Sequence, residues 1–339
     1  MKTVLRGGKL YKDGALTDNG SFEISDVTNM NDCDEKRVIE LDNSFILPSF
    51  CDVHVHFREP GFGYKETIRQ GSLAGARGGY TVVGTMPNLK PVPCDMDSLR
   101  VQQEIIDRDA VIQVIPYGTI TKDQSGTGTL SDMEGMANHV LAFSDDGKGV
   151  QDDGLMREAM NVAKSLNKLI VAHCEDESLL REGKVRESEW RQIERDLKLA
   201  DETGCGYHVC HISCKESVEV IRDAKKSGVN VTCETAPHYL VLDAEDVRKG
   251  IAEDPEDRKA MIEGALDGTV DMIATDHAPH SAEEKSKGFE KSLNGITGLE
   301  CAFPVLYTGL VRPGVMTLER LVQSHRGNAS DFRWATVTQ

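Results

Sequence analysis

The sequence lacks the long apolar segments that mark membrane and exported proteins. It has no apolar run near the roughly 18 residues that a membrane span requires. The first residues, MKTVLRGGKLYKDG, reach a polar turn without an apolar core of signal-peptide length. These absences exclude a membrane partner and predict a cytoplasmic location.

Positive charge and paired cysteines are also scarce. Lys and Arg number 39 against 56 Asp and Glu, so the net charge of -17 repels a phosphate backbone and excludes nucleic acid as a general partner. The nine cysteines include no C-x-x-C pair, which favours reduced thiols over a disulfide framework. A zinc cluster of Cys205, Cys210 and Cys214 is an alternative, although their spacing lacks the tight pairs of structural zinc sites.

Strand-like and helix-like segments alternate along most of the chain. Residues 1–47 mix short segments with the polar turns KDG, TDNG and NDCDEK, which predicts a small β module. Eight β-rich runs then follow, each succeeded by a polar stretch, some of them with helical spacing: FCDVHVHF, YTVVGTMPN, VIQVIPYG, HVLAFSDD, LIVAHCED, GYHVCHIS, NVTCETAPH and DMIATDHAPH. This order predicts an α/β fold, a (β/α)8 TIM-like barrel over residues 48–322. An open doubly wound sheet is disfavoured, because no G-x-G-x-x-G follows the first strand.

The first run ends in two histidines that alternate along a strand. Residues two apart in a strand point to the same face, so His54 and His56 can present two nitrogens to one ion. The alternative is a pair of core histidines with local hydrogen bonds.

Further ligand types stand at the ends of four other runs. They are Asp145 and Asp146, His173, His211, and the group Asp276, His277 and His280. An Asp pair before glycine is often turn chemistry, and a buried His is often a satisfied core residue. Their repetition in successive βα units favours zinc or a similar divalent ion that acts on water.

Six of these motifs together resemble one enzyme family. DVHVHFREPG, GTMPN, FSDDG, AHCED, CHIS and ATDHAPH, in this order, are similar to the bacterial (class I) dihydroorotases of the amidohydrolase superfamily. The resemblance implies a barrel with a small β-sandwich module to which the N-terminal segment contributes. It implies one or two zinc ions per chain, bound by His54, His56, Asp146, His173, His211 and Asp276. It also implies a substrate-binding set: Arg58, Asn88, His280, Asn294 and Gly295.

The chemistry that the resemblance implies is reversible cyclisation of N-carbamoyl-L-aspartate to (S)-dihydroorotate in pyrimidine biosynthesis. A divalent ion lowers the pKa of its bound water to about 7, and Asp276 is expected to move the proton to the departing amide nitrogen. Arg58 offers a planar fork to a carboxylate, unless it pairs at the surface with Glu59 or Glu66. The expected partner is a small-molecule substrate, and a homodimer is left open.

Other functions within and outside the superfamily are disfavoured by particular residues. Allantoinases carry asparagine where Arg58 stands. Dihydropyrimidinases and hydantoinases bridge their metals through a carboxylated lysine, whereas the matching stretch here, LAFSDDG, has acids, and Lys148 follows as an expected solvated charge. A non-catalytic barrel subunit would have no need of six ligands.

Two stretches depart from the family pattern. Family members carry an N-P-P-L-R loop after the run TAPHYLVLDAEDV, but no asparagine occurs here between Asn230 and Asn294. Residues 323–339 show neither helical nor strand periodicity and are predicted to be an aberrant tail, with the C-terminal part of the β module missing. Open strand edges would result. The chain is therefore expected to be poorly soluble or nearly inactive.

Overall fold

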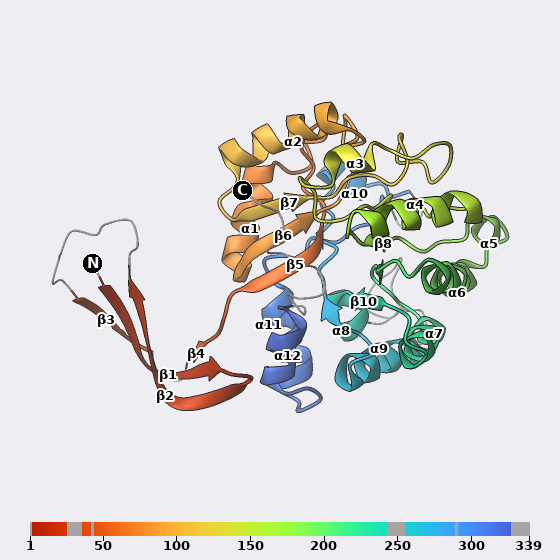
Figure 1. Cartoon of the computed structure of the whole chain (residues 1–339). Helices are drawn as coiled ribbons and strands as arrows, with labels where there is room; N and C mark the ends of the chain where they lie inside the picture. Colours follow the sequence, from red (N-terminus) through yellow and green to blue (C-terminus); the bar gives the residue numbers. More distant parts are fainter. Residues whose placement is uncertain (1, 26–35, 42–43, 243–254, 289–290, 327–339) are drawn as a thin grey trace.

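An N-terminal sheet stands at one side of the molecule. The computed structural model describes residues 2–25, 36–41, 44–242, 255–288 and 291–326. Strand β1 (Lys2–Lys12) pairs antiparallel with β2 (Ala15–Ser25) and parallel with β3 (Lys36–Glu40) and β4 (Phe45–Ile46). Figure 1 shows this sheet projecting from the helical part of the chain. The sandwich expected for this module stays a prediction.

The turn between β1 and β2 explains how this hairpin forms. Asp13 and Gly14 have φ values of 51° and 87°, the left-handed conformation that a type I′ hairpin turn requires at both central positions. The polar turn KDG therefore joins two strands, as the sequence predicts.

Parallel strands form the centre of the remaining chain. One sheet has the order β5 (Phe50–Val55), β6 (Tyr80–Thr85), β7 (Gln113–Pro116). The other has the order β11 (Met272–Ile273), β10 (Val231–Thr235), β9 (Tyr207–Val209), β8 (Ile170–Ala172). All neighbours within these sheets are parallel, which confirms the α/β class.

Isolated parallel bridges join the two sheets at both ends. Phe143 pairs with Gly118 after β7 and with Ile170 of β8, and Val55 of β5 pairs with His277 after β11. The backbone pairing thus runs in a closed order. Seven of the eight predicted runs are strands, and the fourth, HVLAFSDD, contributes the bridges at Phe143.

Helices cover the outside of these strands (Figure 1). The longer ones are α1 (Ile68–Gly78), α2 (Met96–Asp109), α4 (Asp153–Ser165), α6 (Val185–Thr203), α7 (Lys215–Lys226), α9 (Pro255–Asp267) and α12 (Leu318–Ser324). The short ones are α3 (Met133–Met136), α5 (Glu177–Arg181), α8 (Pro237–Val241), α10 (Ala282–Lys285), α11 (Ala302–Leu306) and the π-helix η1 (Tyr307–Val311). None of the helices within the described ranges is long and apolar enough to cross a membrane.

Local sequence explains where α1 begins and ends. Thr67 caps it through a reciprocal pair of hydrogen bonds with Gln70, and Gly79 closes it in the left-handed conformation at φ 89°. The apolar spacing of the segments around α1, α4 and α7 predicts these helices, and the structure confirms them.

Apolar side chains of the central strands and of the residues after them form one buried cluster. It includes Val53, Met86, Ile115, Tyr117, Leu141, Val171 and Met272. A larger apolar layer packs between the strands and the outer helices. Polar groups that follow the strands are thereby held on rigid elements.

The last described residues belong to the folded structure. Helix α12 ends at Ser324, and the buried His325 ring packs against Phe50 and Phe303. The amide of Cys51 donates to the carbonyl of His325 at 2.9 Å. The boundary predicted at residue 322 therefore cuts through α12. Residues 243–254 and 327–339, on which the predicted loop loss and most of the predicted tail depend, lie outside the described residues.

Candidate metal centre

The structure brings all six predicted metal ligands together at the carboxyl ends of the strands. His54 lies in β5 and His56 follows it. His173, His211 and Asp276 come within three residues of the ends of β8, β9 and β11, and Asp146 follows the bridges at Phe143. The six side chains form two groups of three, and within each group the ligand atoms all lie within 4.8 Å of one another. One group is His54, His56 and Asp276, and the other is Asp146, His173 and His211.

The Asp146 carboxylate lies between four imidazoles. Its Oδ1 is 3.5 Å from His54 Nε2, 3.7 Å from His173 Nδ1 and 3.6 Å from His211 Nε2. Its Oδ2 is 3.5 Å from His56 Nε2. One carboxylate therefore faces the ligand atoms of both groups.

Asp276 completes the first group. Its Oδ1 is 3.0 Å from His56 Nε2 and 3.6 Å from His54 Nε2. In the second group His173 Nδ1 and His211 Nε2 are 2.9 Å apart.

These residues fit a divalent ion. Ligand atoms that are about 2.1 Å from one ion lie roughly 3 to 3.5 Å from one another, close to the separations found here. Buried His54 Nε2 and Asp146 Oδ1 have no hydrogen-bond partner among the described residues, although buried polar atoms normally have one. An ion bound by both atoms would satisfy them.

Charge and burial act against each other at this centre. Burial alone would raise the pKa of Asp276, but the hydrogen bond with His56 and the nearby imidazoles hold that pKa well below its usual value. Burial alone would lower the pKa of His211, but Asp146 and Asp276 raise it to about 9. Asp276 is therefore a carboxylate at neutral pH, as a metal ligand or a base must be.

Two of the predicted ligands have unusual backbone conformations. His211 has φ 32° and Asp276 has φ 45°, in the left-handed region that side chains other than glycine seldom occupy. Strain of this kind concentrates where a surrounding structure holds a residue for function. The positive φ values distinguish His211 and Asp276 from ordinary residues at strand ends.

Two candidates named with the ligands have other partners. Asp145 accepts hydrogen bonds from the amides of Ile120 and Thr121, so it stabilises a turn. His277 Nδ1 accepts from the amide of Gly298, and its Nε2 faces Glu66 at 3.0 Å. Both are absent from the candidate ligand groups of the described residues.

Cysteine contributes one neighbour to the centre. Cys210 lies near His54 and Asp146, whereas Cys205 and Cys214 belong to none of the candidate groups within the described chain. Burial raises the pKa of Cys210 strongly, so its sulfur remains a neutral thiol.

A buried acid that sequence patterns did not identify stands behind His54. Glu234 of β10 is 1% exposed, and its Oε1 is 2.6 Å from His54 Nδ1. Burial alone would raise its pKa, but His54 and His208 lower it to about 2. The sequence clue was a charged residue in the middle of the predicted strand run NVTCETAPH.

Glu175 is the corresponding acid beside His173. Its Oε2 lies 2.9 Å from His173 Nε2, and its side chain is 41% exposed. His173 thus faces Asp146 with one nitrogen and a solvent-accessible carboxylate with the other.

The predicted substrate-binding side chains lie on loops around the centre. Arg58 is buried and donates from Nε to the carbonyl of Pro279 at 3.1 Å. Asn88 donates to the carbonyl of Asp146 at 2.6 Å. The two acids considered as surface partners of Arg58 bind elsewhere, since Glu59 accepts from the amide of Ile68 and Glu66 faces His277.

The other three predicted residues lie on the loop after β11. His280 Nδ1 is 3.2 Å from Lys65 Nζ, and the imidazole also hydrogen-bonds the backbone of Asn294. Gly295 has φ 135°, and a Cβ there would lie 2.5 Å from the carbonyl of Ala278. The hydrogen bond between His280 and Asn294, together with the close approach of Gly295 to Ala278, fixes the conformation of residues 294–295.

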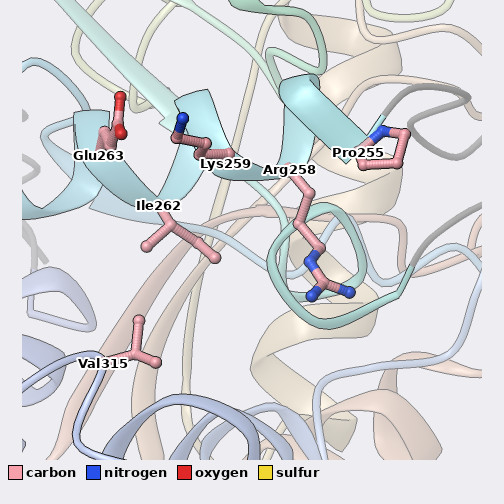
Figure 2. Close-up of a pocket in the computed structure, with 6 residues that line it drawn as sticks. All are labelled: Pro255, Arg258, Lys259, Ile262, Glu263 and Val315. Atoms are coloured by element: carbon pink, nitrogen blue, oxygen red, sulfur yellow. The ribbon is translucent and has the colours of Figure 1, made fainter.

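A separate hollow of about 380 Å³ lies on α9, away from these residues. Figure 2 shows Ile262 and Val315 pointing toward one another across it, with Arg258 and Lys259 nearby. It contains none of the predicted site residues. The metal centre, rather than this hollow, concentrates the candidate chemistry.

Comparisons with known proteins agree on one family. A family profile described as dihydro-orotase-like matches residues 43–217. A dihydroorotase from Fusobacterium nucleatum is 48% identical, over 94% of this chain and 80% of that protein. A dihydroorotase from Bacillus cereus is 45% identical, over 93% of this chain and 79% of that protein.

Solved structures share the fold at low sequence identity. The L-hydantoinase (dihydropyrimidinase) from Arthrobacter aurescens superposes with a TM-score of 0.85 at 22% identity, over 98% of this chain and 82% of that one. The dihydropyrimidinase from Brevibacillus agri gives 0.79 at 21% identity, over 96% and 80%.

Proposed function

The chain belongs to the dihydroorotase family of cyclic-amide hydrolases, and we propose that it interconverts N-carbamoyl-L-aspartate and (S)-dihydroorotate at a centre of one or two zinc ions. This reaction is a step of pyrimidine biosynthesis. The observation that carries the proposal is the Asp146 carboxylate, which lies within 3.7 Å of four imidazole nitrogens. We also propose that the closed strand order is a (β/α)8 barrel. The cytoplasmic location, the homodimer and the domain boundaries remain predictions.

Six side chains would hold the metal: His54, His56, Asp146, His173, His211 and Asp276. A divalent ion bound there would supply a Lewis acid and hydroxide at neutral pH. Asp146 faces both ligand groups and is the bridging residue of the proposal.

Asp276 is the proposed general acid and base. Its low pKa keeps it ionised, so it can accept the proton of the water that attacks the ring amide carbonyl. It then returns that proton to the departing ring nitrogen. In the opposite direction the same group removes the proton from the ureido nitrogen as the ring closes.

Arg58 is the proposed carboxylate-binding residue. Its Nε is engaged by Pro279, which orients the guanidinium and leaves the two Nη groups to bind a carboxylate in two-point fashion. Asn88, His280 and the segment Asn294–Gly295 complete the proposed substrate contacts.

The hydantoinase type of centre is not supported by the residues present. Lys148 lies two residues beyond Asp146 and is exposed, so the aspartate rather than this lysine faces the imidazoles. The likeness to hydantoinases at 22% identity concerns the fold.

The test is turnover by the zinc-loaded chain on three substrates: dihydroorotate, allantoin and dihydrouracil. Whatever hydrolysis the chain catalyses, we expect it to be of dihydroorotate alone. Arg58→Gln should lower its kcat/KM about ten- to a hundredfold, since a hydrogen bond to a charged group contributes about 1.5 to 3 kcal/mol. Bound zinc should not change. Arg77→Gln, at an exposed α1 position, is the matched control.

Equal turnover of allantoin would contradict the assignment of substrate. Unchanged kinetics in Arg58→Gln would contradict the role of that residue.

A further inference from the structure

A buried chain of hydrogen-bonding groups extends from the metal centre into the protein interior. His54 Nδ1 is 2.6 Å from Glu234 Oε1, and Glu234 Oε2 is 3.2 Å from His208 Nε2. His208 Nδ1 is in turn 2.8 Å from Thr232 Oγ1. The chain links β5, β10 and β9, which meet only in the folded ring.

These groups are removed from solvent. His54 and His208 are 0% exposed and Glu234 is 1% exposed. A buried carboxylate is costly unless its oxygens are hydrogen-bonded, and here each oxygen has an imidazole partner. The two contacts fix the plane of the carboxylate from both sides.

The direction of the hydrogen bonds follows from the groups involved. An ionised carboxylate only accepts, so the proton between Glu234 and His54 must reside on Nδ1. In the neutral imidazole, the form that binds a metal ion, His54 Nε2 then has a free lone pair, and this nitrogen lies 3.5 and 3.6 Å from Asp146 and Asp276. A metal-binding histidine requires this arrangement.

We propose that Glu234 is a positioning residue of the centre, held by His208, that fixes the His54 tautomer and ring so that Nε2 faces the metal. The proposal deepens the proposed function and rests on it for the identity of the ion. The hydrogen-bonded geometry behind His54 stands independently of the substrate.

Glu234→Gln keeps the size of the side chain and removes the obligatory acceptor, because an amide can donate to Nδ1 as well as accept from it. Asp196→Asn is the matched control. Asp196 is a fully buried carboxylate of α6 that accepts from Tyr207 at 2.6 Å, and it contacts none of the six proposed ligands in the contacts found for the described residues.

Three measurements separate positioning from a general structural effect. Competition with a chromophoric chelator measures zinc affinity, and we expect a 10- to 100-fold loss in Glu234→Gln and no loss in Asp196→Asn. The visible absorption of the cobalt-loaded protein should change in Glu234→Gln alone. Nitrogen NMR of His54 in the metal-free chain, recorded at a pH high enough for the ring to be neutral, should show the Nδ1–H tautomer in the wild type and a mixture of tautomers in Glu234→Gln.

The outcomes distinguish this proposal from the proposed function. If Glu234→Gln retains wild-type zinc affinity, cobalt spectrum and His54 tautomer while the wild type hydrolyses dihydroorotate, positioning by Glu234 is overturned and the function stands. If the three measurements change as expected while the wild type fails to turn over dihydroorotate, the positioning holds and the proposed function fails.

Discussion

Two histidines of the centre have acidic partners that differ in their surroundings. The His54–Glu234 pair is 2.6 Å apart and wholly buried, whereas the His173–Glu175 pair is 2.9 Å apart and its acid is 41% exposed. In the buried pair water cannot replace a lost partner, so the protein alone sets the imidazole orientation. In the exposed pair water reaches the Glu175 carboxylate itself, so His173 is not its only partner. Metal binding should therefore depend more on the His54–Glu234 pair than on the His173–Glu175 pair.

The two buried acids Glu234 and Asp196 also differ from each other in pKa. Glu234 lies between two imidazoles, which lower its pKa to about 2 against the effect of burial. Asp196 lies behind β9, where burial raises its pKa to about 6 against the opposing effects of Arg195 and Tyr207. Equal burial thus has opposite results, because Glu234 has two imidazole partners and Asp196 faces a tyrosine hydroxyl and a single arginine.

The largest expected effect comes from replacing the buried histidine. His54→Ala should remove the more tightly bound zinc and lower kcat/KM for dihydroorotate by roughly three orders of magnitude, because metal assistance contributes several kcal/mol. His173→Ala should lower zinc content by less. Elemental analysis of both purified variants, with turnover measured on the same samples, checks the order. Greater zinc loss in His173→Ala would reverse the comparison.

How far the sequence predicts this site depends on whether the pattern is local. His54 and His56 alternate on one strand, and the other ligands follow strand ends, so a barrel topology is enough to bring them together. Glu234 reaches His54 from 180 positions away, and this contact depends on the register of β10 relative to β5. The sequence of the run NVTCETAPH alone does not predict how β10 is placed relative to β5.

Adjacent residues of one motif show the same limit. FSDDG offers Asp145 and Asp146 as equal candidates, but Asp145 accepts backbone amides from the loop after β7 and only Asp146 faces the imidazoles. Likewise the eighth predicted run contains Asp276 and His277, and the structure separates Asp276, which faces His56, from His277, which faces Glu66 and accepts from the Gly298 amide. Residue type alone could not separate them.

Asp196→Asn tests the buried acid with the raised pKa. The folded-state pKa of about 6 lies above the unfolded value, so ionisation opposes folding above that pH, and this cost disappears as pH falls through it. The cost at neutral pH is about 3 kcal/mol. The free energy of unfolding of the variant relative to wild type should therefore rise by up to that amount between about pH 4 and pH 8. Urea unfolding across this range provides the measurement.

For Glu234 the sign is opposite. Its folded-state pKa of about 2 lies below the unfolded value, so its stabilisation is present above about pH 4.5 and is lost as pH falls through about 2. A difference between Asp196→Asn and wild type that does not vary with pH would remove the distinction between the two acids.

Glu175→Gln should have the smallest effect. The glutamine keeps the size of the side chain beside His173 Nε2, and water reaches this position because the Glu175 side chain is 41% exposed. Removing an outer-shell partner costs about 10- to 100-fold in metal affinity when the protein alone supplies it, and we expect less than about tenfold here. Chelator competition with zinc, run beside Glu234→Gln, gives the ratio of the two losses. Equal losses of zinc affinity in the two variants would mean that solvent access does not protect His173. Both acids would then act through their charge rather than through the orientation that they impose on the imidazole.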